Sequence, residues 1–218
     1  MMIDTQIDYL KKKLEESHFK ISEKQIDQFK LYLIQLLQWN KKTNLISKKD
    51  ESVIISRHFL ESISLLEIFQ IPENSKLIDV GSGGGFPGVP IKIMRPDLYM
   101  TLLDSKRFRF LFLNELVSKL DLTKIKVLKE RAEILSVNPE FSKKYDFVIA
   151  RAVTQLDKLY LWTHQFLKSE GSILTFKGGK FHSEMERVKK IYKTEVRKFE
   201  INSSLVNSDR ELFLVQLI

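Results

Sequence analysis

A cluster of glycines after a short apolar segment is the feature that most narrows the fold of this chain. Five of the eight glycines lie within residues 79–88, and the first of them directly follows the short, mostly apolar run 77–80. Glycine adopts positive φ angles without strain and lets a ligand approach the backbone, as happens where a strand turns into a helix beside a bound molecule. A tight turn without a ligand is the alternative, which so many glycines disfavour. We therefore expect an α/β domain with a ligand site at this turn.

Short apolar runs alternate with helical patterns along the rest of the chain. After the run 77–80, strands are expected at 99–103, 125–128, 147–149 and 172–176, with helices at 105–120 and 156–167. Two more strands, at 195–201 and 212–218, are separated only by a polar loop and should pair as an antiparallel hairpin. This alternation predicts a doubly wound, mostly parallel, seven-stranded sheet.

The first 72 residues carry no strand signal. Apolar residues follow helical spacing from Ile3, and Ser22 followed three residues later by Gln25 has the form of a helix N-cap. A third helix is expected over 51–69, before Pro72. The prediction is an α-helical cap over residues 1–72, ahead of an α/β domain over residues 73–218.

The composition excludes several chemistries. The chain has no cysteine, which rules out disulfides, iron–sulfur clusters, Cys-bound zinc and thiol nucleophiles. Its four histidines are scattered, so no metal site is expected. No apolar run reaches the ~18 residues of a membrane span, and no signal peptide is expected, so a cytoplasmic protein without membrane contact is predicted. The 36 Lys and Arg against 28 Asp and Glu give a charge of +8. That charge suits a nucleic-acid partner, although it can also serve solubility alone.

The residues of the glycine turn limit which ligand it can hold. A dinucleotide-binding turn has a third glycine beside the pyrophosphate, and here that position is Phe86. Pro87 and Pro90 remove backbone donors that a phosphate would use. S-adenosylmethionine joins a nucleoside to an amino acid without a phosphate and suits the turn, with NAD as the alternative. Gly81 and Gly83 would then contact the cofactor.

Two later strand ends add to this site. Asp104 closes the second strand, where an acidic side chain can accept both ribose hydroxyls. Ala132 and Glu133 follow the third strand, where adenine would lie in a doubly wound sheet. The alternative for Glu133 is a solvated position at the start of a helix.

Several motifs follow one another in a fixed order along the chain. They occupy residues 39–40, 44–45, 57–62, 81–88, 102–105, 131–133, 145–146, 150–152, 177–178 and 210–215, the last beginning at Arg210. In this order they resemble the glucose-inhibited division protein B family, the bacterial 16S ribosomal RNA guanine-N7 methyltransferases. Glu61 stands where that family has Asp. Phe108 stands where it has a lysine, and Lys106 or Arg107 is a candidate to supply the missing charge.

The resemblance implies a Rossmann-like, class I S-adenosylmethionine-dependent methyltransferase fold. It implies methyl transfer to N7 of a guanine in 16S ribosomal RNA, within a small ribosomal subunit in preference to naked RNA. The sequence leaves the oligomeric state open, and a monomer is the simplest expectation. It also implies cofactor contacts at Gly81, Phe86, Ala132, Glu133 and Arg151.

The expected chemistry needs no catalytic side chain. Guanine N7 carries a lone pair and no proton, so its attack on a sulfonium methyl requires only an in-line approach at close range. No residue is therefore assigned a proton-transfer role. Arg57, His58 and Asn44 are candidates for positioning the target. A capping or core-satisfied pair is the alternative for Arg57 and His58.

Cations at strand ends and in loops are candidates for RNA phosphate contacts: Arg109, Arg131 and Lys177. The phenylalanines are expected in the core, except Phe86, whose bulky ring inside a glycine loop is not expected there. Three other functions stay open from the residues alone. They are a nicotinamide oxidoreductase, a non-catalytic RNA-binding assembly factor, and a methyltransferase for a protein or small molecule.

Overall fold

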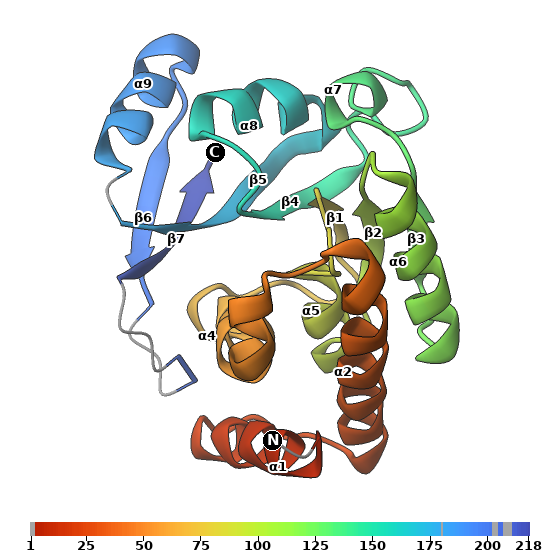
Figure 1. Cartoon of the computed structure of the whole chain (residues 1–218). Coiled ribbons are helices and arrows are strands. Elements are labelled where there is room, and N and C mark those ends of the chain that lie inside the picture. Colours follow the sequence, from red (N-terminus) through yellow and green to blue (C-terminus); the bar gives the residue numbers. More distant parts are fainter. Residues whose placement is uncertain (1–2, 180, 202–204, 207–210) are drawn as a thin grey trace.

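The computed structural model describes residues 3–179, 181–201, 205–206 and 211–218. A seven-stranded sheet forms its centre, in the order β3-β2-β1-β4-β5-β7-β6 (Figure 1). The strands are β1 (Lys76–Val80), β2 (Tyr99–Leu103), β3 (Ile125–Leu128), β4 (Tyr145–Arg151), β5 (Leu167–Gly178), β6 (Val196–Glu200) and β7 (Leu212–Leu217). Strands β1 to β5 run parallel to one another, whereas β7 runs antiparallel to both β5 and β6. The predicted doubly wound sheet and C-terminal hairpin are both confirmed.

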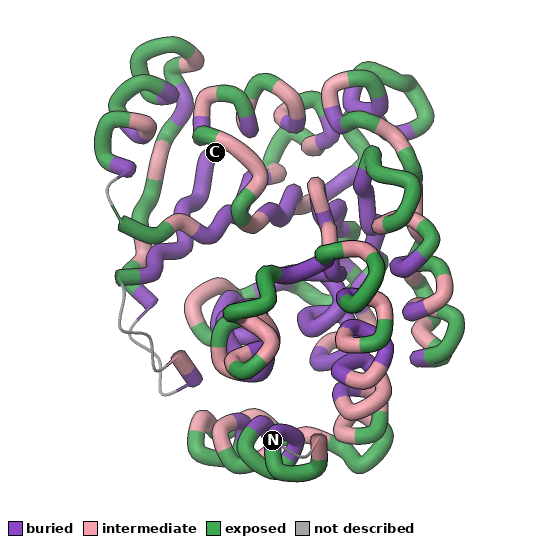
Figure 2. Tube along the Cα trace, viewed as in Figure 1, coloured by how far each residue is buried: buried purple, intermediate pink, exposed green. Residues whose placement is uncertain are grey.

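Helices cover both faces of the sheet (Figure 1). One layer contains α1 (Ile3–Glu16), α2 (Glu23–Thr43), η1 (Lys48–Val53), η2 (Ile55–Leu60), α3 (Glu61–Ile63), α4 (Leu65–Ile68), α5 (Gly88–Met94) and α6 (Arg107–Lys119). The other contains α7 (Ala132–Leu135), α8 (Leu156–Thr163), η3 (His164–Phe166) and α9 (His182–Tyr192). Because both faces are covered, the central strands are buried along most of their length (Figure 2). This is why they read as continuous apolar runs instead of alternating ones.

Successive residues of β1 contribute to opposite layers. Leu77 belongs to the core beneath the N-terminal helices, whereas Ile78 and Val80 belong to the core beneath α7, α8 and α9. The period of two along a strand places Asp79 on the same side as Leu77. The strand therefore directs the Asp79 carboxyl towards the N-terminal helices and α5.

The N-cap of α2 forms as the sequence predicts. The Ser22 hydroxyl accepts a hydrogen bond from the Gln25 N–H at 3.3 Å, and the Gln25 side chain accepts one from the Ser22 N–H at 2.8 Å. This capping box satisfies two backbone donors that the first turn of a helix leaves unpaired. The helix ends at Thr43, and its C-cap residue Asn44 has a left-handed backbone with φ of 48°.

The third helix predicted over 51–69 is wrong as a single element. The chain instead forms a 3₁₀ turn (η1), a π-helical turn (η2) and two short α-helices (α3 and α4). Serine hydroxyls bond to backbone carbonyls along this stretch, such as Ser62 to His58 at 2.5 Å and Ser64 to Glu61 at 2.8 Å. Such bonds compete with regular helical pairing, and π turns recur at functional sites. Apolar spacing alone does not distinguish these helix types.

The second half of the chain shows two differences from the predicted element bounds. The helix predicted over 156–167 ends at Thr163, and the 3₁₀ turn η3 completes the segment. Strand β5 begins at Leu167, earlier than predicted, because Leu167 already pairs with Tyr145 of β4. The motif residue Arg210 lies outside the described residues.

The N-terminal helices and the sheet share one core. A single cluster of buried side chains joins Tyr32 and Phe59 of the cap to Phe86, Phe112 and Leu174 of the remainder. The predicted division into a cap over 1–72 and a domain over 73–218 therefore describes the order of the elements along the chain. The division itself stays a prediction. Among the described residues, no helix is long and apolar enough to span a membrane, and no group of three His, Asp or Glu side chains could hold a metal ion.

Candidate functional site

The glycine turn lies at the carboxyl edge of the sheet, between β1 and α5. The Gly81 N–H donates to the Leu103 carbonyl over 2.8 Å, which ties the turn to the end of β2. Gly81 and Gly85 have φ angles of +71° and +94°, which residues with side chains rarely adopt. A Cβ at Gly85 would also lie 2.6 Å from the Tyr32 hydroxyl. The turn needs glycine both for its conformation and for its close contact with the cap.

A cavity of about 230 Å³ opens beside this turn. Its lining includes these residues predicted to hold the cofactor: Gly81, Asp104, Ala132 and Glu133. The Asp104 carboxylate is 4% exposed and accepts hydrogen bonds from the N–H groups of Gly83 at 3.0 Å and Lys106 at 2.9 Å. We call this space the donor cavity. Its carboxylate at the end of the second strand matches the position from which this fold binds ribose hydroxyls.

Two cations predicted for RNA phosphates also line the donor cavity. Arg109 pairs with Asp104 at 3.2 Å, and Arg131 pairs with Glu133 at 3.3 Å. The sequence analysis assigned both arginines to RNA and not to the cofactor. Each follows the end of a strand by a few residues, and its side chain pairs with a carboxylate at that edge of the sheet. Both arginines therefore compensate carboxylates of the donor cavity.

Asp79 lies beneath the turn, and the sequence did not single it out as a site residue. Its Oδ2 accepts a hydrogen bond from the Gly88 N–H at 3.0 Å, while its buried Oδ1 has no hydrogen-bond partner among the described residues. Burial raises the pKa of Asp79 to about 7, against the opposing effects of the Gly88 hydrogen bond and the Arg151 charge. An acid directly before a glycine turn, within an apolar strand, was the available signal.

A second cavity, of about 370 Å³, lies between the π turn and the ends of β4 and β5. It brings together residues predicted for three roles: Arg57 and His58 for positioning the target, Lys177 for an RNA phosphate, and Arg151 for the cofactor. Arg151 is not in the lining of the donor cavity. Ala152 lines both this cavity and the donor cavity, so the two are adjacent. We call the second space the target cavity.

Arg151 is the centre of the target cavity. Its guanidinium donates to the Arg57 carbonyl at 2.8 Å, pairs with the buried carboxylate of Glu61 at 3.4 Å, and contacts His58 Nδ1. It also lies 5.1 Å from the centre of the Phe86 ring. These contacts fix the π turn to the end of β4, so the backbone that carries Arg57 and His58 is held at the carboxyl edge.

Asp50 completes the polar wall of this cavity. It pairs with Arg57 at 3.3 Å and lies 3.8 Å from His58 Nε2. Burial works to raise the pKa of Asp50, but the hydrogen bond from Ser47 and the charges of His58 and Arg57 outweigh it, so the pKa lies below its usual value. The target cavity thus keeps the Asp50 carboxylate ionised beside its cations.

The prediction that the Phe86 ring lies outside the core was wrong. The ring is 5% exposed and packs on Tyr32 and His58, with ring centres 5.5 Å and 4.8 Å apart. The Tyr32 hydroxyl donates to the Gly84 carbonyl at 2.5 Å, and burial raises its pKa well above the usual value, which keeps the donor proton in place. The cap covers the glycine turn, and the Phe86 ring fills the space between them. This ring faces the core, so only its backbone is left to serve the predicted cofactor contact.

Asn44 lies apart from both cavities, although it was predicted to position the target. It is exposed at the end of α2 and is absent from both linings. The neighbouring Asn40 is the buried one, donating to Glu51 at 2.7 Å and accepting from the Ile46 N–H at 2.9 Å. Asn40 therefore connects α2 to the segment that leads into the π turn.

The remaining predicted cations differ in their surroundings. The Lys177 ammonium is held in the target cavity by the Thr154 carbonyl at 2.9 Å and Glu184 at 2.8 Å. Lys106 lines the donor cavity, whereas Arg107 is in neither lining. Phe108 is 64% exposed. Of the two candidates to replace the lysine missing at Phe108, only Lys106 lies at the site.

Comparisons with known proteins agree with this arrangement. Residues 25–213 match the family model described as rRNA small subunit methyltransferase G, GidB. The enzyme of that name from Desulforamulus reducens is 38% identical over 83% of this chain and 75% of its own. The one from Acetivibrio thermocellus is 42% identical over 78% of this chain and 69% of its own.

A solved structure of an S-adenosylmethionine-dependent methyltransferase from Aquifex aeolicus shares the fold. Its TM-score is 0.57 at 17% sequence identity, covering 84% of this chain and 97% of that one. At this identity the likeness establishes the fold alone, whereas the family match and the relatives cover most of the chain. The chain belongs to the GidB family of small-subunit ribosomal RNA methyltransferases.

Proposed function

We propose that this protein transfers a methyl group from S-adenosylmethionine to N7 of a guanine in 16S ribosomal RNA. The observation that supports this most is the adjacency of the two cavities, which meet at Ala152 along the carboxyl edge. In a doubly wound sheet, ligands bind at this edge. The donor cavity suits a nucleoside with a charged tail. The target cavity presents cations to a nucleotide, together with His58, whose ring stacks on Phe86.

The residues of the donor cavity fit S-adenosylmethionine. Asp104 is placed for the ribose hydroxyls, the backbone of Ala132 and Glu133 for adenine, and the backbone at Gly81 and Gly83 for the amino acid tail. Asp79 is buried beneath the same turn and lines neither cavity, so its carboxyl would act on a bound cation only at a distance, through the turn. When bound, the cofactor supplies an electrophilic methyl group on a sulfonium.

The reaction asks the protein to position and desolvate, not to move a proton. The guanine N7 lone pair forms the new N–C bond while the S–C bond breaks, and the positive charge passes from sulfur to the purine ring. Arg57, His58 and Arg151 hold the target cavity in shape, and their contacts fix where a base can lie. The carboxylates of Asp50 and Glu61 tolerate the charge that develops on the guanine. No general base is required.

The proposal extends to the setting of the reaction. The net charge of +8 and the cations of the target cavity suit an RNA phosphate backbone. We propose that the substrate RNA lies within a small ribosomal subunit, that the protein acts as a monomer, and that it does so in the cytoplasm.

Small subunits from cells that lack this activity provide the test. After incubation with the protein and S-adenosylmethionine, new 7-methylguanosine in 16S RNA is mapped by aniline cleavage. The product should appear with the wild type and be lost with Gly81→Ala and Arg151→Lys. Arg197→Lys, at an exposed arginine paired with Glu195, is the matched control and should keep activity.

The outcomes separate the competing functions. Cofactor binding without any methylated RNA would favour a non-catalytic assembly factor, and binding of NADH instead would favour an oxidoreductase. Full activity in both site variants, with folding unchanged, would remove the site assignment.

A further inference from the structure

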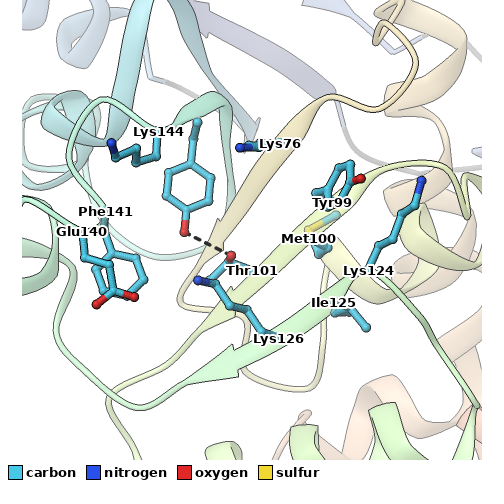
Figure 3. A pocket seen from close by; sticks show the side chains of 11 residues that line it. Lys76, Tyr99, Met100, Thr101, Lys124, Ile125, Lys126, Glu140, Phe141 and Lys144 are labelled. Atoms are coloured by element: carbon cyan, nitrogen blue, oxygen red, sulfur yellow. Dashed lines mark hydrogen bonds between the residues drawn. The ribbon is translucent and has the colours of Figure 1, made fainter.

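A lysine-lined hollow lies at the edge of the sheet opposite the two cavities of the proposed reaction. Its volume is about 440 Å³, and it is formed where β1, β2 and β3 begin and where the chain enters β4. Four lysines surround it: Lys76, Lys124, Lys126 and Lys144. Figure 3 shows the four lysines with Thr101 among them. The Tyr145 hydroxyl donates a buried hydrogen bond of 3.1 Å to the Thr101 hydroxyl. We call this space the lysine hollow.

The charges of these lysines are largely uncompensated. The ammonium groups of Lys76, Lys126 and Lys144 make no hydrogen bond or ion pair with any residue that the structure describes. The Lys124 ammonium donates to the Asn74 side chain at 3.0 Å and to the Asp97 carbonyl at 3.3 Å. Both acceptors are neutral, so they hold the Lys124 side chain in place without an opposing charge.

Nearby carboxylates form their ion pairs with other cations, although the charge of Lys76 also acts on Asp146. Asp146 pairs with Lys168 at 2.6 Å, and Asp97 pairs with Arg95 at 2.7 Å. Glu140 is the one carboxylate in the lining among the described residues. Four lysines against one glutamate leave the hollow with a surplus of three positive charges. Such a concentration of charge attracts a polyanion.

The aromatic rings of the hollow are covered by lysines. The Lys124 ammonium lies 4.8 Å from the centre of the Tyr99 ring, and the Lys126 ammonium lies 4.7 Å from that of Phe141. A ring face covered by a cation is not free to stack on a nucleobase. The hollow therefore offers positive charge and a polar floor, which favours a sugar–phosphate backbone over an exposed base.

The lysine hollow is distant from the reacting groups. Strand β1 runs from Lys76 at the hollow to Val80 at the donor cavity, and five strand residues span about 15 Å. A ligand in the hollow cannot be the guanine that receives the methyl group. It must belong to another part of the same RNA or to a separate molecule.

We propose that the lysine hollow binds phosphate groups of the substrate RNA at a segment remote from the target base. This inference rests on the proposed function, because it assigns the hollow to the same RNA. Such a contact would hold the RNA without carrying sequence information, so it should act on affinity and leave the methyl-transfer step unchanged.

A triple variant tests this: Lys76→Gln, Lys126→Gln and Lys144→Gln. With small subunits as substrate, we expect KM to rise about tenfold near physiological salt while kcat stays the same. Binding to protein-free 16S RNA should depend less steeply on salt, with the log–log slope reduced by about 2 for three lost phosphate contacts. Affinity for S-adenosylmethionine should be unchanged. A matched control carries the same substitution at three exposed lysines elsewhere: Lys20, Lys158 and Lys190.

Three results would overturn the assignment. The first is a salt slope and KM equal to those of the control variant. The second is weaker binding to whole subunits with unchanged binding to protein-free RNA, which would indicate a ribosomal protein as the partner. The third is loss of tight binding to a nucleoside monophosphate with an unchanged RNA slope, which would indicate a small-molecule site. If the wild type methylates no RNA, the proposed function fails. The salt dependence of binding to protein-free 16S RNA, compared between the triple variant and the control, still tests whether the lysine hollow binds RNA phosphates.

Discussion

The Asp79 carboxyl links the stability of the protein to pH. Burial raises its pKa to about 7 from 3.8, so the folded state holds a proton that the unfolded chain has released across this range. The stabilising contribution is fully present below pH 3.8 and is lost as the pH rises through about 7, with a total of about 4 kcal/mol. Urea unfolding of the protein without cofactor should therefore show stability falling from pH 5 to 8, relative to Asp79→Asn.

The Asn variant is the control, because it keeps the shape and cannot titrate. Parallel pH profiles for the two proteins would show that Asp79 is ionised throughout and that the prediction is wrong. A cationic ligand above the turn favours the ionised carboxylate, so affinity for S-adenosylmethionine should rise from pH 6 to 8 in the wild type alone.

Gly85 separates the two reasons for glycine in the turn. Its φ of +94° strains any side chain, and a Cβ would also meet Tyr32 Oη at 2.6 Å and Val89 Cγ2 at 2.9 Å. Gly85→Ala should lower the free energy of unfolding by about 2 to 4 kcal/mol, from strain and overpacking together. Gly179 has φ of +68° and nothing within 4 Å of a Cβ, so Gly179→Ala should cost about 1 kcal/mol. If Gly85→Ala and Gly179→Ala lowered the denaturant midpoint equally, the contact of Gly85 with the cap would contribute nothing to the loss of stability.

At the scale of elements, one ion pair joins the π turn region to β4. Glu61 is 1% exposed, and its carboxylate pairs with Arg151 at 3.4 Å. Removal of one charge leaves the other buried, so Glu61→Gln should lower the free energy of unfolding by about 3 kcal/mol and abolish methyl transfer. Glu195→Gln breaks an exposed pair with Arg197 and should cost less than about 1 kcal/mol. Similar losses of unfolding free energy in the two variants would show that the buried pair stabilises the fold no more than the exposed pair does.

Elements were predictable from the sequence where apolar runs have clear ends. Strands β2 and β3 match their predicted bounds, since each is a short apolar run between polar turns. The π turn was not predictable, because its apolar residues keep helical spacing and only the serine bonds reveal the change. The Phe86 ring was misplaced for a similar reason. A linear sequence does not show that the cap covers the glycine turn, and that cover is what places the ring in the core.

The same distinction holds for the site. Gly81, Asp104, Ala132 and Glu133 were placed together because strand order alone brings their strand ends to one edge. Pairing of Arg109 with Asp104 depends on a side-chain direction in the first turn of α6, which no spacing rule supplies.

At the scale of the whole molecule, the cap and the sheet should unfold together. The chain has two tryptophans, which report on opposite layers. Trp39 of the cap packs edge-on against Phe112 of α6 at 5.8 Å, whereas Trp162 of α8 packs in the layer on the other face. Because the cap core is continuous with the sheet and the sheet carries both layers, one cooperative transition is expected.

Single-tryptophan variants measure each layer separately. Trp39→Phe leaves Trp162 as the fluorescent reporter, and Trp162→Phe leaves Trp39. Each variant is compared with its own far-ultraviolet circular dichroism, which corrects for any change in stability that the substitution causes. Fluorescence and circular dichroism should give the same denaturant midpoint and slope within each variant. If Trp39 fluorescence changed at lower denaturant than the circular dichroism, the cap would unfold before the sheet. The Tyr32–Gly84 bond and the Phe86 packing would then be too weak to couple the cap to the glycine turn.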